Sequence, residues 1–206
     1  MALRIISMNT MSTTLFKTAL SVSLLLSLST LASASIPQKW KLDVPKTKVD
    51  FKVAYLGNGA VEGQFNSMNG SINYDMINPT NTTINFTVNT NSIDAGSNLR
   101  NAFLRRKELL NSAKYPTMTF VSNKVSMVTG KEANVIGNFT AFGQTKPLTV
   151  KIKINNVEND PITRKPVIRF KATSVINRYH YGVTAFPNTV GTMILLEISG
   201  NLIAVN

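Results

Sequence analysis

The chain has 206 residues, with 22 lysines and arginines against 10 aspartates and glutamates, so its formal net charge is +12. It contains no cysteine and one histidine, His180. These counts exclude disulfides, thiol chemistry and zinc sites built from cysteines or several histidines. The positive charge admits nucleic acid, anionic lipid headgroups or envelope polyanions as partners. Because no dense basic run carries interleaved aromatic residues, we expect no nucleic-acid binding; a peripheral membrane-surface contact and an ordinary solvated surface both stay open.

Residues 1–34 have the pattern of an export signal. Arg4 and Lys17 supply positive charge, residues 19–31 form an uncharged run, and Ala32, Ser33 and Ala34 make a cleavage site of small residues. The uncharged run is shorter than the roughly 20 residues that span a bilayer, so a membrane anchor is the less favoured alternative. We therefore expect a signal peptide over residues 1–34, one mature domain over residues 35–206, and a periplasmic or secreted protein.

Alternation of apolar and polar residues predicts short strands along most of the mature chain. The expected strands cover residues 40–44, 49–55, 61–74, 84–88, 118–120, 135–142, 148–154, 168–172 and 194–198. Turn signals separate them, and the longest predicted loop is the polar segment 156–166. Such short, regularly spaced strands indicate an all-β antiparallel barrel or sandwich.

One helix interrupts the strands between residues 92 and 122. Apolar or partly apolar positions recur there at spacings of three and four, at Leu99, Ala102, Phe103, Arg106 and Leu110. The spacing predicts a helix from Leu99 to Leu110 with this face inward. The helix is either a plug whose apolar face belongs to the core, or a lid over a cavity that holds an apolar ligand.

The residues offer little for catalysis. His180 has no sequence neighbour that would make it a base, and Asp94 is better explained as a cap or turn residue than as an acid. No phosphate loop, serine elbow or cofactor motif is present. We therefore predict no enzyme activity, no catalytic residue, no metal and no cofactor.

Five motifs, in this order and spacing, resemble the YceI-like family of exported polyisoprenoid-binding proteins. They are G-Q-F with G-S-I in 63–72, S-I-D-A-G with R-N-A-F-L in 92–104, Y-P-x-x-x-F-x-S in 115–122, G-N-F-T-A-F-G-x-T-K-P in 137–147 and N-R-Y-H-Y-G in 177–182. The chain departs from the family pattern at Asn101, Phe103 and Thr192, where an Asp, a His and an acidic residue are usual.

The resemblance implies an extended, eight-stranded, lipocalin-like β-barrel with one short inserted α-helix. It also implies a polyisoprenoid or similar long-chain amphiphilic lipid in the lumen, no catalysis, and often a homodimer. For the pocket lining we predict mainly aromatic side chains: Phe51, Val53, Phe65, Phe86, Leu99, Phe103, Phe120, Phe142 and Phe170. For head-group contacts we predict four basic residues by position: Arg100, Arg105, Arg178 and His180.

Two other functions stay open. A barrel filled by its own side chains would leave a basic surface that binds envelope polyanions, with binding that weakens steeply as salt rises. A hydrolase or isomerase acting on the bound lipid would need His180 or a carboxylate for turnover.

Overall fold

The computed structural model describes residues 38–75 and 77–205, so the predicted signal peptide lies outside the described residues. The strands are β1 (Gln38–Leu42), β2 (Lys48–Tyr55), β3 (Gly59–Phe65), β4 (Met68–Tyr74), β5 (Thr83–Asn89), β6 (Ile93–Asp94), β7 (Thr117–Thr129), β8 (Glu132–Ala141), β9 (Gln144–Asn159), β10 (Pro166–Asn177) and β11 (Val190–Ala204). The helices are α1 (Asn98–Leu104) and four 3₁₀ turns, η1 (Val44–Lys46), η2 (Pro79–Asn81), η3 (Thr90–Ser92) and η4 (Arg178–Tyr181).

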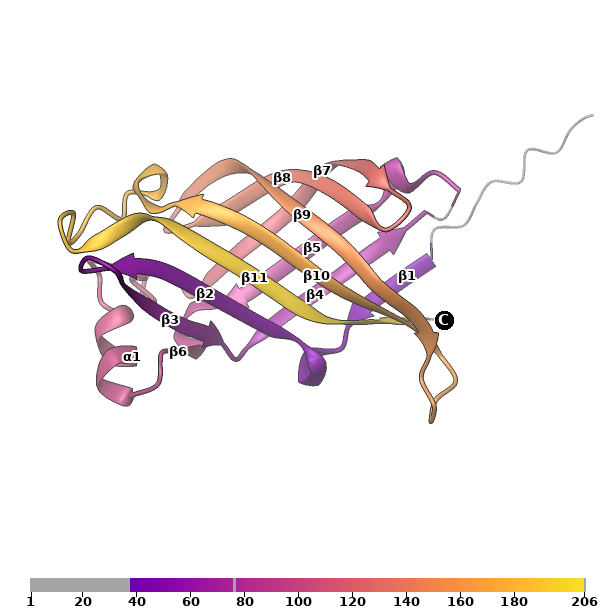
Figure 1. Ribbon diagram of the computed structural model, residues 1–206, viewed down its shortest axis with the longest axis horizontal. Helices are drawn as coiled ribbons and strands as arrows, with labels where there is room; N and C mark the ends of the chain where they lie inside the picture. Colours follow the sequence, from indigo (N-terminus) through magenta and orange to yellow (C-terminus); the bar gives the residue numbers. More distant parts are fainter. Residues whose placement is uncertain (1–37, 76, 206) are drawn as a thin grey trace, which may run out of the picture. The chain divides into compact units, whose positions relative to one another are not determined.

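The strands close into a barrel of antiparallel neighbours (Figure 1). Within the described residues, eight strands form the ring in the order β1-β4-β5-β7-β8-β9-β10-β11, and β1 pairs back onto β11. The first half of β11 pairs with β2, which continues the sheet through β3 to β6. The predicted eight-stranded, lipocalin-like barrel with one short α-helix is confirmed, and closure leaves no exposed sheet edge along the ring.

The single strand predicted over residues 61–74 is wrong, because the chain breaks into β3 and β4. At the break, the backbone N–H of Asn66 donates to the carbonyl of Ser92 (3.0 Å) and that of Ser67 donates to the Ser92 hydroxyl (3.0 Å). Ser92 therefore takes the hydrogen bonds that a continuous ladder would have supplied.

The loop predicted over residues 156–166 is shorter than expected, because residues 156–159 and Pro166 belong to strands. Val157 lies opposite Ile168, and Pro166 lies opposite Asn159, so β9 and β10 continue as a two-stranded arm. Strands pair through their backbone hydrogen bonds, whether or not their side chains alternate between buried and exposed. A polar sequence without that alternation therefore gave no sign of the last residues of β9 and the first of β10.

The helix is shorter than predicted and presents a different face. Ser97 caps it by accepting from the backbone N–H of Arg100 (3.3 Å), and it ends at Leu104 instead of Leu110. Leu99, Ala102, Phe103 and Arg106 are exposed, whereas Leu104 and Leu110 pack against the core. No helix in the described part of the chain is both long enough and apolar enough to cross a membrane.

Candidate functional site

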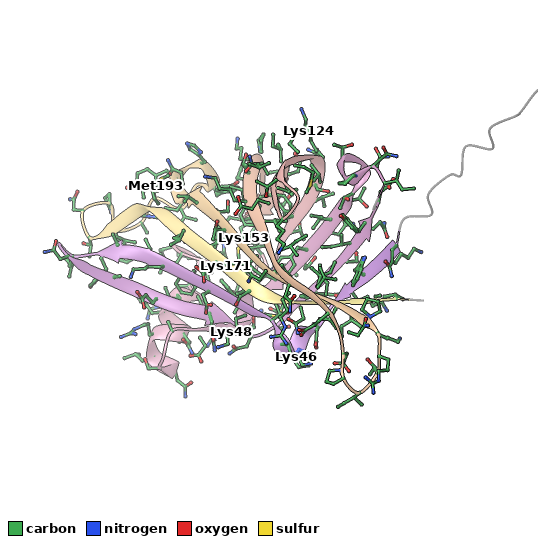
Figure 2. The ribbon with its side chains drawn as sticks, turned by 45° about the vertical axis from the view of Figure 1, so that its right-hand side comes forward. Lys46, Lys48, Lys124, Lys153, Lys171 and Met193 are labelled. Carbon is green, nitrogen blue, oxygen red and sulfur yellow. The ribbon has the colours of Figure 1, made fainter. Side chains whose placement is uncertain are left out.

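The barrel is hollow, with a cavity of about 180 Å³ between its walls. A single buried water needs roughly 10–15 Å³, so this space is more than a packing defect. Its wall is almost entirely apolar, and β9 gives the clearest stripe, with Leu148, Val150, Ile152 and Ile154 facing inward. The intervening residues of β9 are exposed, and Lys153 of β9 and Lys171 of β10 lie on the outer face (Figure 2).

The cavity opens at the end of the barrel opposite α1. Its lining there includes residues at the end of β4, in the β4–β5 connection and in the β7–β8 hairpin, and of these Met127 and Lys131 are exposed. We call this set the mouth: Tyr74, Pro79, Thr82, Met127 and Lys131. Strand β5 runs from this end toward η3, β6 and α1, so the helix lies at the far end of the barrel (Figure 1). No residue of α1 lines the cavity. The interpretation of the helix as a lid over the cavity is therefore wrong.

The α1 end of the barrel is filled with side chains. Tyr181 is buried with its ring edge-on to Phe139, at 5.5 Å between ring centroids, and burial raises the pKa of its hydroxyl. Leu104 and Leu110 pack against the same cluster, together with buried Ile93. The helix is therefore a plug, as one of the two interpretations held. Of the predicted stripe only Leu110, which follows the helix, packs against the core, and Leu104, which the prediction left out, packs there with it.

Arg178 fastens this closed end. Its guanidinium is buried and donates to five backbone carbonyls of the segment that follows: Gly191 (2.9 Å), Val183 (2.7 Å), Ala185 (2.7 Å), Val190 (2.8 Å) and Phe186 (3.5 Å). The carbonyl groups of this segment have few hydrogen-bond donors from the backbone, and the five N–H groups of the arginine guanidinium supply donors. Arg178 is thus engaged in structure and is not free to contact a ligand.

The entry to α1 is organised by the motif residues that precede it. Asn101, which stands where the family usually has Asp, accepts from the backbone N–H of Ala95 (2.7 Å) and donates to Asp94 (3.2 Å). The backbone N–H of Gly96 and then the Asn101 amide lower the pKa of the exposed Asp94 carboxyl below its ordinary value of 3.8. Asp94 and Asn101 therefore hold a turn, as predicted for Asp94.

The structure brings four of the nine predicted lining residues together on the cavity wall: Phe65, Phe86, Phe120 and Phe170. Phe51 and Val53 are buried but lie toward the α1 end, where Phe51 packs on Phe65 at 5.7 Å between ring centroids. Leu99, Phe103 and Phe142 do not line the cavity. Leu99 is exposed, and Phe103 packs on Phe186 outside the barrel (5.6 Å between ring centroids). Phe142 adopts a positive φ of 53° in the β8–β9 turn.

The four predicted head-group residues lie at the closed end, away from the mouth. Arg100 donates to the carbonyl of Ala95 (2.7 Å) and Arg105 to that of Asn91 (3.2 Å). Exposed His180 has Asn177 as its neighbour at 3.5 Å. None of the four lines the cavity. Sequence position did not show which end of the barrel the cavity reaches.

Polar groups at the open end were missed from the sequence. Lys131 and Glu132 belong to the lining, and Glu132 pairs with Lys153 at 3.2 Å. Trp40 and Thr82 also line the cavity, and each has a buried polar atom without a hydrogen-bond partner in the described structure, Nε1 and Oγ1 respectively. Among residues 38–75 and 77–205 there is no cluster of three potential metal ligands.

A hollow, antiparallel barrel with an apolar lumen defines a lipocalin-like class of protein. The model of the YceI-like domain family matches residues 40–202, and the chain belongs to this family.

Relatives support the family assignment, and solved structures support the fold. A UPF0312 protein of Pseudomonas paraeruginosa is 39% identical over 113 residues, which are 55% of this chain and 59% of that protein. The crystal structure of Burkholderia cenocepacia BcnA superposes with a TM-score of 0.69 at 22% identity, covering 80% of this chain and 99% of that one. A polyisoprenoid binding domain from Saccharophagus degradans gives a TM-score of 0.61 at 13% identity, covering 81% of this chain and 98% of that one.

Proposed function

We propose that this protein is an exported, non-catalytic carrier that sequesters one long-chain isoprenoid or similar amphiphilic lipid in its barrel. The observation that carries the proposal is the hollow lumen with an apolar wall and one end filled. The polyisoprenoid-binding domain that shares this fold supports the choice of ligand. Export rests on the signal-like sequence of residues 1–34.

The ligand's chain provides the binding free energy. Transfer of each CH₂ group from water to an apolar wall contributes about 0.8 kcal/mol, so roughly ten buried carbons contribute on the order of 8 kcal/mol before costs. Ordering of the chain and loss of its translational freedom are subtracted from that sum. A wall of Ile, Leu, Val and Phe without charged groups in its depth suits this purpose.

The lipid enters the lumen through the mouth with its apolar tail first. The closed end offers a tail only apolar and aromatic contacts, such as Phe65, Phe139 and Val88. The mouth offers the charged Lys131 and Glu132, and Trp40 and Thr82 with their unpartnered polar atoms lie at the same end. An unpaired buried polar group costs about 1–3 kcal/mol, so a head group that pairs with one gains by lying there.

Native mass spectrometry of the protein purified from its own host, followed by lipid extraction, tests this proposal. Ile152→Gln places an amide on the lumen wall, and Lys151→Gln is the matched control, one residue away on the outer face of the same strand. We expect a stoichiometric long-chain adduct that survives high salt in the unsubstituted protein and in the control. In Ile152→Gln the adduct should fall roughly tenfold, because an amide desolvated in the lumen has no partner.

A protein that is empty and also refuses added isoprenoids contradicts the proposal. Function would then move to the basic surface, and binding of envelope polyanions should fall steeply with salt. An adduct that is converted to product, with turnover lost in His180→Ala, would instead indicate an enzyme.

A further inference from the structure

The mouth end carries three protruding loop tips, each with an exposed aliphatic side chain. Ile77 lies in the β4–β5 connection and is 66% exposed, Val128 lies at the β7–β8 hairpin and is 58% exposed, and Ile162 lies in the β9–β10 turn and is 89% exposed. We call these three residues the mouth ring. Single exposed aliphatic residues are ordinary, but here three separate connections present one at the same end of the molecule.

The charges beside the mouth ring are positive. Lys131, Arg164 and Lys165 are exposed, and none of them has a carboxylate within 4.0 Å in the described structure. Lys124 also projects from β7 at this half of the barrel (Figure 2). The surface around the mouth therefore attracts anions.

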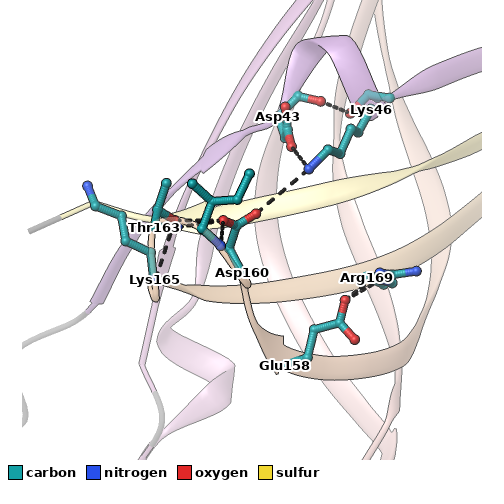
Figure 3. Close-up of polar contacts among 9 residues, drawn as sticks. Asp43, Lys46, Glu158, Asp160, Thr163, Lys165 and Arg169 are labelled. Carbon is teal, nitrogen blue, oxygen red and sulfur yellow. Dashed lines mark hydrogen bonds and ion pairs between the residues drawn. The ribbon is translucent and has the colours of Figure 1, made fainter.

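Three acidic residues at the same end are already paired. Glu132 pairs with Lys153 (3.2 Å), and Glu158 accepts from Arg169 Nε (2.8 Å). Asp160 contacts Lys46 (3.9 Å) and accepts from the backbone N–H groups of Thr163 (2.8 Å) and Ile162 (3.1 Å) (Figure 3). The ion pairs offset the charge of these carboxylates, and the hydrogen bonds of Asp160 order the β9–β10 turn that carries the exposed Ile162.

We propose that the mouth end docks on the surface of an anionic lipid bilayer, with the mouth ring inserted between headgroups and the unpaired lysines and arginines against them. Aliphatic side chains flanked by cations are the combination that binds such an interface. Docking in this orientation sets the opening of the lumen directly against the membrane, so a lipid passes from bilayer to barrel without crossing water.

A second copy of the chain fits this surface less well than a membrane does. A stable protein interface needs a continuous complementary area of about 800 Å² on each partner, whereas the mouth ring is three separate projections around an opening. A symmetric pair would also bring unpaired cations of the two copies together. A fluid bilayer accommodates separate tips and supplies the opposite charge.

Flotation with vesicles of phosphatidylcholine containing phosphatidylglycerol tests the docking. The test pair is Val128→Ser with Ile162→Ser. The chain offers a matched control at the closed end, Leu56→Ser with Leu99→Ser, since Leu99 is 82% exposed. We expect the test pair to lose vesicle affinity roughly tenfold and the control pair to bind unchanged, because interfacial binding scales with the inserted apolar area. Arg164→Gln with Lys165→Gln should reduce the dependence on phosphatidylglycerol.

Three results would overturn the inference: no vesicle binding by the unsubstituted protein, loss of binding in the control pair alone, or a dimer in sedimentation that Ile162→Ser dissociates. The inference builds on the proposed carrier function but fails separately from it. Loading of the test pair with isoprenoid from detergent measures the lumen alone. If the test pair loads isoprenoid normally and loses vesicle binding, docking through the mouth ring is established, and unchanged vesicle binding by the test pair overturns it. If the test pair loses vesicle binding and the lumen of the unsubstituted protein stays empty, only the carrier function fails.

Discussion

At the scale of single residues, the closed end of the barrel depends on Arg178. A buried cation is usually costly, but here the guanidinium is surrounded by carbonyl oxygens of residues 183–191, so its five N–H groups have partners. The same hydrogen bonds fix the backbone of residues 183–189, which form neither helix nor strand, where they lead into β11. Loss of the side chain therefore leaves several carbonyls without donors at once.

Arg178→Met should lower the free energy of unfolding by roughly 2–4 kcal/mol, because unpaired buried carbonyls retain their desolvation cost. Thermal and urea unfolding measure this. Arg169→Met is the control: Arg169 pairs with Glu158 on the surface, and its loss should cost less than about 1 kcal/mol. Equal losses in the two variants would show that the carbonyl cluster contributes nothing to stability.

Glycines decide where aromatic rings enter the lumen. A Cβ at position 137 would lie 2.5 Å from Phe120 Cζ and 2.5 Å from the carbonyl oxygen of Val121. At position 70 it would lie 3.0 Å from Phe86 Cδ2. Both glycines thus leave room for phenylalanines of the cavity wall. The packing role of Gly70 could not be predicted from the sequence, because it depends on the cross-strand register that places Phe86 opposite it.

At the scale of elements, α1 shows how a helical period can be correct while its inward face is not. Leu99, Ala102 and Phe103 recur at helical spacing, yet the residues that pack against the core are the partly buried Leu104 and, after the helix, Leu110. The entry turn sets the rotation of the helix, since Asn101 is held by Ala95 and Asp94. A sequence period gives no such rotation when the helix has only seven residues.

Leu104→Ser should therefore destabilise the protein by roughly 2–3 kcal/mol, because it removes apolar contacts from the closed end and buries a hydroxyl. Leu99→Ser, five residues earlier on the exposed face, should change stability by less than about 0.5 kcal/mol. Chemical denaturation of the two variants checks this pair. If Leu99→Ser is the more damaging change, the face assigned to α1 is wrong.

The strands were predictable where one face carries charge. In β9 the lysines at 151 and 153 mark the outer face, so Ile152 and Ile154 follow as inner residues. The predicted lining consisted mainly of phenylalanines and therefore omitted these aliphatic residues, although the sequence of β9 alternates clearly between apolar and polar residues. Phe51 and Phe65 share the inner face but meet at the filled end, a distinction that depends on position along the barrel.

At the scale of the whole molecule, the barrel has two unlike ends. One is filled by Tyr181, Leu104 and Leu110, and the other opens between η2 and the β7–β8 hairpin. Which end opens depends on loops whose sequences carry no strong pattern, and for this reason the head-group residues were predicted at the closed end. The family motifs predicted the barrel itself, because they lie on strands, turns and α1 between residues 63 and 182, within the matched residues 40–202.

We propose that a lipid chain occupies the lumen and enters through the mouth. Titration of lipid-free protein with geranylgeraniol, an isoprenoid alcohol, tests it most directly when Ala133→Phe is compared with Ala102→Phe. Ala133 lies on the lumen wall beside the mouth, whereas Ala102 is exposed on α1.

We expect the unsubstituted protein and Ala102→Phe to bind one geranylgeraniol molecule per protein chain. Ala133→Phe should remain folded in circular dichroism and lose affinity for geranylgeraniol at least tenfold, because the added ring occupies the path of the lipid. Undiminished binding by folded Ala133→Phe, or loss of binding in Ala102→Phe alone, would contradict the proposal and place the ligand outside the lumen.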